Sequence, residues 1–204
     1  MTSVALLILA ALWLPIQADE AAAVEQAQRE ALSRIRRSRG EASPEVANAV
    51  IALASTLDSR GQSKNVEKLY RLEIDVSRKN ADKGNTRALS TAFAEWLLKA
   101  GRPADAELLA RGALKLGLET LKADDWRLAG ARAVAGEALA ARGRFAQAEP
   151  FLLKAQAGLE TAADAPEEAK KKAVRDLVAL YEAWERASPG QGKMAEAARW
   201  KARF

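Results

Sequence analysis

Apolar residues recur at intervals of three and four along most of the chain, which predicts amphipathic helices rather than strands. The clearest example is the segment Phe145 to Leu159, whose regularly spaced members on one face are Phe145, Ala148, Leu152 and Ala155. The tight turn Arg142-Gly143-Arg144 separates it from a second periodic segment, Arg127 to Ala141. This pattern predicts two antiparallel helices joined at a glycine.

The same helix–turn–helix plan appears twice more upstream. The expected helices are Thr86 to Lys99 and Pro103 to Leu116 around Gly101, and Pro44 to Ser59 and Asn65 to Arg78 around Gly61. Gly61, Gly101 and Gly143 are separated by 40 and 42 residues. A constant period of this length is typical of stacked repeats. An ordinary helical bundle is the alternative, and the regular spacing favours stacking.

The final copy follows the same plan with a longer connection. Asp164 and Pro166 are expected to cap its first helix. Its expected buried stripe is Leu177, Leu180, Tyr181 and Trp184. Because Gly192 lies 49 residues after Gly143, we expect an insertion of about seven residues in the turn, followed by a closing helix from Lys193 to Phe204.

A further helix is expected before the repeats, from Asp19 to Arg39. It carries acids early and arginines late, an order that suits the helix dipole, and Gly40 follows it. Its apolar stripe is expected at Val24, Ala27, Ala31 and Ile35. A stripe this narrow suits docking on a neighbouring helix.

The amino-terminal run from Val4 to Ile16 is uncharged and too short for a membrane span, but it has the length of a signal-peptide core. We therefore expect an exported protein, periplasmic or secreted, with cleavage after Ala18. The alternatives are an uncleaved signal that anchors the chain to the membrane and a buried first helix of a cytoplasmic protein. Neither a basic residue before the core nor a small residue at position 16 is present, so these alternatives stay open.

These patterns divide the chain into three parts. The expected parts are a signal peptide at 1–18, an N-terminal helix at 19–42, and a repeat domain at 43–204 with copies at 43–83, 84–123, 124–163 and 164–204.

Composition narrows the chemistry. The chain has no histidine and no cysteine, which removes the commonest general base, thiol nucleophiles, the usual zinc ligands and disulfides. We therefore expect no catalytic residues, no metal and no cofactor. Glu119, Asp124 and Asp125 are the best raw material for an enzyme, as paired carboxylates. Acidic linkers of this kind are more often helix caps.

The repeat resembles the tetratricopeptide repeat (TPR) family, in its longer form of about 42 residues found in kinesin light chains and bacterial signalling proteins. Gly136 matches the small residue of the family's first helix, and Phe145, Ala148 and Ala155 match its aromatic and alanine positions. Two departures are Arg132, where the family has a large apolar residue, and Val66, where it has alanine. The resemblance covers about 43 to 204 and implies an all-α, right-handed superhelical solenoid of stacked antiparallel helix pairs.

The resemblance also implies a function, a non-enzymatic scaffold that binds segments of other proteins in a concave groove lined by the first helices. By the family register, the groove positions are Asn48, Ser55, Glu95, Lys99, Glu137, Lys172, Arg175 and Glu182. Partners are therefore expected to be proteins or peptides.

The alternative function is binding of an anionic surface, lipid or nucleic acid, through basic helices. Its candidate residues are Arg34, Arg36, Arg37 and Arg39, or Lys170, Lys171 and Lys172. A net charge of +5 over 204 residues is a weak signal for nucleic acid, and no aromatic residues interleave with these charges. No nucleic acid is expected as a partner, and membrane contact is expected only through an uncleaved leader.

Overall fold

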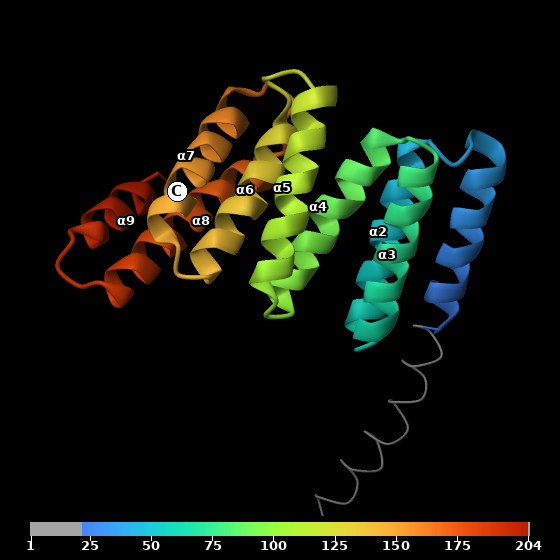
Figure 1. Ribbon diagram of the computed structural model, residues 1–204, viewed down its shortest axis with the longest axis horizontal. Coiled ribbons are helices and arrows are strands. Elements are labelled where there is room, and N and C mark those ends of the chain that lie inside the picture. The colour runs from blue at the N-terminus through green and yellow to red at the C-terminus, as the bar shows by residue number, and fades with distance from the viewer. Residues whose placement is uncertain (1–21, 204) are drawn as a thin grey trace, which may run out of the picture. The chain divides into compact units, whose positions relative to one another are not determined.

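The computed structural model describes residues 22–203, and every regular element within this range is an α-helix (Figure 1). A helix at residues 22–39, here called the N-terminal helix, comes first. The following helices are α2 (Pro44–Ser59), α3 (Ser63–Lys79), α4 (Lys83–Lys99), α5 (Pro103–Thr120), α6 (Trp126–Ala141), α7 (Phe145–Thr161), α8 (Glu167–Ala187) and α9 (Lys193–Lys201). The chain divides into two compact units, residues 1–85 and 86–204, and α4 begins at their boundary.

The expected helix positions are confirmed, with ends that move by a few residues. The largest difference is at α5, which continues to Thr120, four residues past the expected end at Leu116. The expected signal peptide, the start of the N-terminal helix at 19–21 and the last residue, Phe204, lie outside the described residues.

Within the first unit, α2 and α3 pack together as an antiparallel pair around buried aliphatic side chains such as Val50 and Leu53. Val66 is fully buried in α3, so this pair accommodates the larger side chain that replaces the family's alanine. Asn85 donates from Nδ2 to the backbone carbonyls of Glu41 and Ser43, at 3.3 and 3.1 Å. This contact fixes the start of α4 to the loop before α2.

The N-terminal helix docks on this pair through a face that matches the expected one only in part. Val24 is 50% exposed, whereas Leu32 is buried. Ion pairs join Glu25 to Arg60 and Arg36 to Glu73 across this contact. Of the predicted stripe, Val24 and Ala27 are exposed, so that half is wrong, whereas Ala31 and Ile35 are half-buried.

The turns inside the helix pairs share one geometry. Gly61, Gly101 and Gly143 have φ values of 68°, 72° and 72°, a left-handed conformation that favours glycine. After each glycine, the next residue donates its N–H to a carbonyl five residues earlier, as from Arg144 to Leu139 at 2.9 Å. This pattern is a Schellman C-cap, and it explains why the glycine recurs at this point of each copy.

In the second unit, α6 packs against both α5 and α7, and α7 packs against α8 (Figure 1). Gly136 lies at the closest approach of α6 to α7. A Cβ atom built there would stand 2.7 Å from Leu152 Cγ. The small residue expected at this position is therefore required for the helices to approach, and the Leu152 side chain fills the space above it, 2% exposed.

An acid near the start of α5 and of α7 ties neighbouring copies together. Glu107 on α5 accepts from Arg142 and Arg144 at the next turn, and from Arg111 on its own helix at 2.9 Å. Glu149 on α7 holds the corresponding place and lies 3.7 Å from Lys193 at the following turn. The recurring Ala-Glu dipeptide of the sequence thus has a structural role in stacking.

Two predictions about the last copy are wrong in part. The proline opens α8 as expected, since Pro166 is the N-cap and the helix begins at Glu167, but Asp164 does not cap it, because no side chain makes a cap hydrogen bond. The additional length is mostly in the helix, since α8 has 21 residues against 16 in α6. The remaining loop is held by Glu185, which accepts from the backbone N–H groups of Gly190 and Lys193 at 2.6 and 2.7 Å.

The stripe predicted for α8 is confirmed. Leu177, Leu180 and Tyr181 are buried, and Trp184 stacks on Phe145 with ring centroids 6.0 Å apart. The Lys193 ammonium lies 3.7 Å from the centre of the Trp184 ring, a cation–π contact that closes α9 on α8.

Candidate functional site

A small hollow opens where α4, α6 and α8, the first helices of three successive copies, come together. It has a volume of about 130 Å³. Its polar lining residues are Glu95, Glu137, Lys172 and Asp176. Trp126, Val134, Leu159 and Ala173 form apolar walls around them. We call this place the charged hollow.

Lys172 lies at the centre of the charged hollow. Its Nζ donates to Glu137 Oε1 at 2.5 Å and to Asp176 Oδ2 at 2.8 Å. Burial alone would lower the pKa of Lys172, but the two neighbouring carboxylates outweigh it and raise that pKa. Lys172 is therefore held firmly as a cation between acids from two helices.

The carboxylates of the charged hollow outnumber its cation. Burial, together with the charge on Asp176, raises the pKa of Glu137 to about 7. Glu95 stays in contact with solvent, but it stands at the rim, where protein replaces much of the surrounding water, and this burial raises its pKa. Among the lining residues, one ammonium thus faces three carboxylates, and Lys99 exerts a smaller attraction on Glu95.

Three of the residues predicted for the groove, Glu95, Glu137 and Lys172, meet in the charged hollow. Asp176 and Trp126 were not predicted. Asp176 carries a detectable signal, because it lies four residues after Lys172 on the same helix, a spacing at which opposite charges pair. For Trp126, the sequence shows only that it lies at the start of a helix, which does not indicate a binding role.

The other predicted groove residues lie elsewhere. Asn48 and Ser55 are exposed on α2, within the first unit. Lys99 is the exposed last residue of α4, one turn beyond Glu95. Arg175 pairs with Glu168 along α8 at 2.5 Å, and Glu182 pairs with Lys201 on α9 at 2.6 Å. Neither Arg175 nor Glu182 lines the hollow.

Both basic clusters are partly neutralised by acids of the same chain. Arg36 pairs with Glu73 and with Glu41, and Arg39 pairs with Glu45 at 3.1 Å. In the second cluster, Lys170 pairs with Glu167 at 2.8 Å, and Lys172 lies in the charged hollow. Arg34, Arg37 and Lys171 are exposed.

The acidic linker before α6 is a helix cap. Asp125 is the N-cap residue, and its side chain accepts from the backbone N–H of Arg127 at 2.9 Å. Its second oxygen binds the Arg127 guanidinium at 2.6 Å. The Arg127 hydrogen bonds hold the pKa of Asp125 below its ordinary value, so it is set up as a permanent anion rather than as an acid–base group.

Within residues 22–203, no group of three or more acidic, histidine or cysteine side chains is arranged to hold a metal ion. The same part of the chain contains no helix with the length and apolar character needed to span a bilayer.

No protein-family model and no curated protein matches the chain. Solved structures do. A single-substitution variant of a Podosopora anserina protein, described as a candidate kinesin light chain with nearly identical TPR-like repeats, superimposes with a TM-score of 0.60 at 13% identity, over 92% of this chain and 89% of that one. A second structure with the same description gives 0.59 at 13% identity, over 92% and 90%.

At this identity the likeness concerns the fold, and it agrees with the glycine turns, the small residue at the helix crossing and the consecutive helix packing found here. The ordinary helical bundle is thereby set aside. The chain has the all-α TPR-like repeat fold, built of stacked antiparallel helix pairs.

Proposed function

We propose that this protein is a non-enzymatic scaffold that holds a segment of a partner protein against the first helices of its repeats, with the charged hollow as the anchoring point. The observation that carries the proposal is the meeting of Glu95, Glu137 and Lys172 from three successive copies in one hollow. A repeat array presents such a surface without any chemistry of its own.

The chemistry of the hollow favours a partner segment that carries a positive group. Three carboxylates line it against the single lining cation Lys172, and Lys99 acts on Glu95 from outside the hollow. A lysine, arginine or amino-terminal group brought by the partner would supply the missing charge, and the apolar wall at Trp126 would receive the aliphatic stem or the ring beside it.

The test is affinity purification from the native host with a variant that removes the acids but keeps their shape, Glu95→Gln, Glu137→Gln and Asp176→Asn. The matched control neutralises three exposed carboxylates elsewhere, Asp75→Asn, Asp124→Asn and Glu160→Gln. We expect the control to retain the partners of the unmodified protein and the hollow variant to lose them, with unchanged circular dichroism. Equal recovery of partners by both variants contradicts the proposal.

We further propose that the protein works outside the cytoplasm, on the strength of the leader described above. The uncleaved, membrane-anchored form is the alternative, and it leaves the charged hollow unchanged.

A further inference from the structure

A second hollow lies between α5 and α7, and it shares no residue with the charged hollow. Leu114 and Leu118 of α5 line one side, and Pro150 and Phe151 of α7 line the other. Two adjoining recesses of about 300 and 340 Å³ share Leu114, Leu118 and Phe151, so they form one groove. We call it the α5–α7 groove.

The floor of the α5–α7 groove is apolar and open. Leu118, which lines both recesses, is 60% exposed. Large aliphatic side chains this exposed, next to a recess, mark a surface that gains from being covered. Pro150 adds to it, because proline inside a helix presents an apolar ring and has no N–H to donate.

The rim of the same groove is basic. Arg111 and Lys115 of α5, Arg132 of α6 and Lys154 of α7 border it, against the single acid Glu119. In the described part of the chain, no carboxylate pairs with Lys115, Arg132 or Lys154. These three positive charges are therefore unbalanced.

Arg132 and Arg111 place positive charge against the apolar floor itself. Arg132 stands where the family pattern has a large apolar residue, and it is half-buried among the residues that line the groove. The Arg111 guanidinium lies 5.4 Å from the centre of the Phe151 ring while it pairs with Glu107. An apolar side chain that enters the groove would therefore lie close to the positive charges of Arg111 and Arg132.

We propose that the α5–α7 groove docks an acidic amphipathic segment of a partner protein. One large apolar side chain of that segment lies against Leu118 and Phe151, and its flanking carboxylates pair with Lys115, Arg132 and Lys154. Charge complementarity selects this occupant, since an apolar residue flanked by acids matches both the floor and the rim. The proposal is independent of the charged hollow, which lies on other faces of the helices and favours the opposite charge.

An anionic membrane offers the same negative charge, but the shape of the groove disfavours it. A membrane surface is bound by apolar side chains that project from a helix into the lipid. Here Leu114, Pro150 and Phe151 line a recess between two helices. A helix or strand of a partner protein can enter such a recess, whereas a lipid surface would lie across its opening.

The probe is a fluorescein-labelled helical peptide with leucines along one face and glutamates on its flanks, and its partner peptide replaces every glutamate with glutamine. Binding is measured by fluorescence anisotropy, and the site is located from amide shifts in nuclear magnetic resonance spectra. We expect the acidic peptide to bind more tightly than the glutamine peptide, with the largest shifts at Leu114, Leu118 and Phe151.

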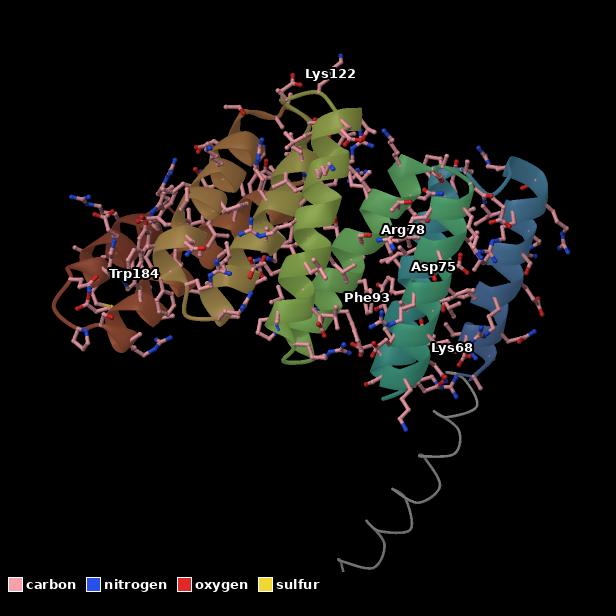
Figure 2. The ribbon with its side chains drawn as sticks, in the orientation of Figure 1. Lys68, Asp75, Arg78, Phe93, Lys122 and Trp184 are labelled. Atoms are coloured by element: carbon pink, nitrogen blue, oxygen red, sulfur yellow. The ribbon has the colours of Figure 1, made fainter. Side chains whose placement is uncertain are left out.

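The variants reverse charge at the rim and, as a control, elsewhere. Lys115→Glu with Lys154→Glu is compared with Lys68→Glu and Lys122→Glu, two exposed lysines on α3 and on the α5–α6 loop (Figure 2). We expect the rim variant to lose about tenfold or more in affinity for the acidic peptide, and the control to stay within about twofold. Circular dichroism confirms that both fold.

Three outcomes overturn the proposal. Equal losses in the two lysine variants indicate unspecific attraction between opposite charges. Shifts that map outside the groove place the peptide elsewhere. Binding to phosphatidylserine vesicles that depends on Lys115 and Lys154, without peptide binding, assigns the groove to a membrane. The hollow variant with neutral Glu95, Glu137 and Asp176 is expected to bind the peptide as the unmodified protein does, which separates this test from that of the proposed function.

Discussion

Gly136→Ala gives the most direct test of how the repeats are packed, because the same change can be made at Gly130 on the same helix. A Cβ at Gly136 would stand 2.7 Å from Leu152 Cγ, 2.8 Å from Leu152 Cδ2 and 3.2 Å from Phe151 Cβ. A Cβ at Gly130 meets no atom within 4 Å. The two substitutions therefore differ in packing and not in chemistry.

The magnitudes follow from this difference. Replacing an interior helical glycine with alanine stabilises a helix by up to about 1 kcal/mol, and that gain applies to both variants. At Gly136 the nearest atoms are about 1 Å inside the usual contact distance of about 3.5 to 4.0 Å. They are the branch point and one methyl of Leu152, a buried side chain that is 2% exposed and has little room to move. Overpacking of this kind costs about 1 to 3 kcal/mol.

The measurement is the free energy of unfolding of both variants and the unmodified protein, from urea titration followed by circular dichroism. Gly130→Ala is expected to be more stable than the unmodified protein. Gly136→Ala is expected to be less stable than Gly130→Ala by about 1 to 3 kcal/mol, because the helix term cancels in the comparison. Equal stability of the two would refute the packing of α6 against α7 described here.

Three further predictions concern charge and processing. Glu107→Gln is expected to destabilise by about 1 to 3 kcal/mol in chemical unfolding, since a buried carboxylate that binds several arginines is lost; a loss no larger than that of exposed Glu160→Gln would contradict this. The free energy of unfolding of the unmodified protein is expected to fall as the pH rises from 4.5 to about 7. In this range Glu137 keeps a proton in the folded state that it has released in the unfolded state. Glu137→Gln should flatten that fall, and an unchanged pH profile argues against it. Intact mass of protein from the native host is expected to place the first residue near Asp19, and recovery of only full-length cytosolic chain contradicts export.

The repeat architecture could be predicted from sequence because it depends on local backbone requirements. A left-handed residue after each first helix favours glycine, so Gly61, Gly101 and Gly143 mark three turns without any knowledge of tertiary contacts. Gly136 and Ala148 are similarly informative, since close helix crossings admit only small side chains. The regular spacing of these turns and small residues is therefore enough to predict the repeat fold.

The errors lie where long side chains decide the outcome. The N-terminal helix was predicted to dock through a stripe that starts at Val24, yet Val24 is exposed, Leu32 is buried, and Glu25 and Arg36 form ion pairs with Arg60 and Glu73. The groove roles of Arg175 and Glu182 stay predictions; each pairs with a neighbouring charge, Glu168 or Lys201, and neither lines the charged hollow. Register predicts where a Cβ atom points, and only the three-dimensional structure shows which partner a flexible charged side chain selects.

The pKa shifts of Glu107 and Glu137 distinguish an acid with a structural role from an acid that is available to a partner. Burial alone would raise the pKa of Glu107, but hydrogen bonds from Arg142 and Arg111 outweigh it and hold that pKa below its ordinary value. Glu137 is shifted the opposite way, to about 7, because burial and the charge of Asp176 exceed the effect of Lys172. A positive group that enters the charged hollow would stabilise the ionised form of Glu137.

The raised pKa of Glu137 makes partner binding depend on pH near neutrality. Below about pH 7 a cationic partner group must displace the Glu137 proton, whereas above it the carboxylate is already ionised. Affinity for a co-purified partner is therefore expected to rise between pH 6 and pH 8, and Glu137→Gln should remove most of this rise. Calorimetry in buffers of different ionisation enthalpy would detect the released proton at pH 6. An affinity that is flat across this range would mean that the partner group does not contact Glu137, and the anchoring role would then have to be sought among other residues of the first helices.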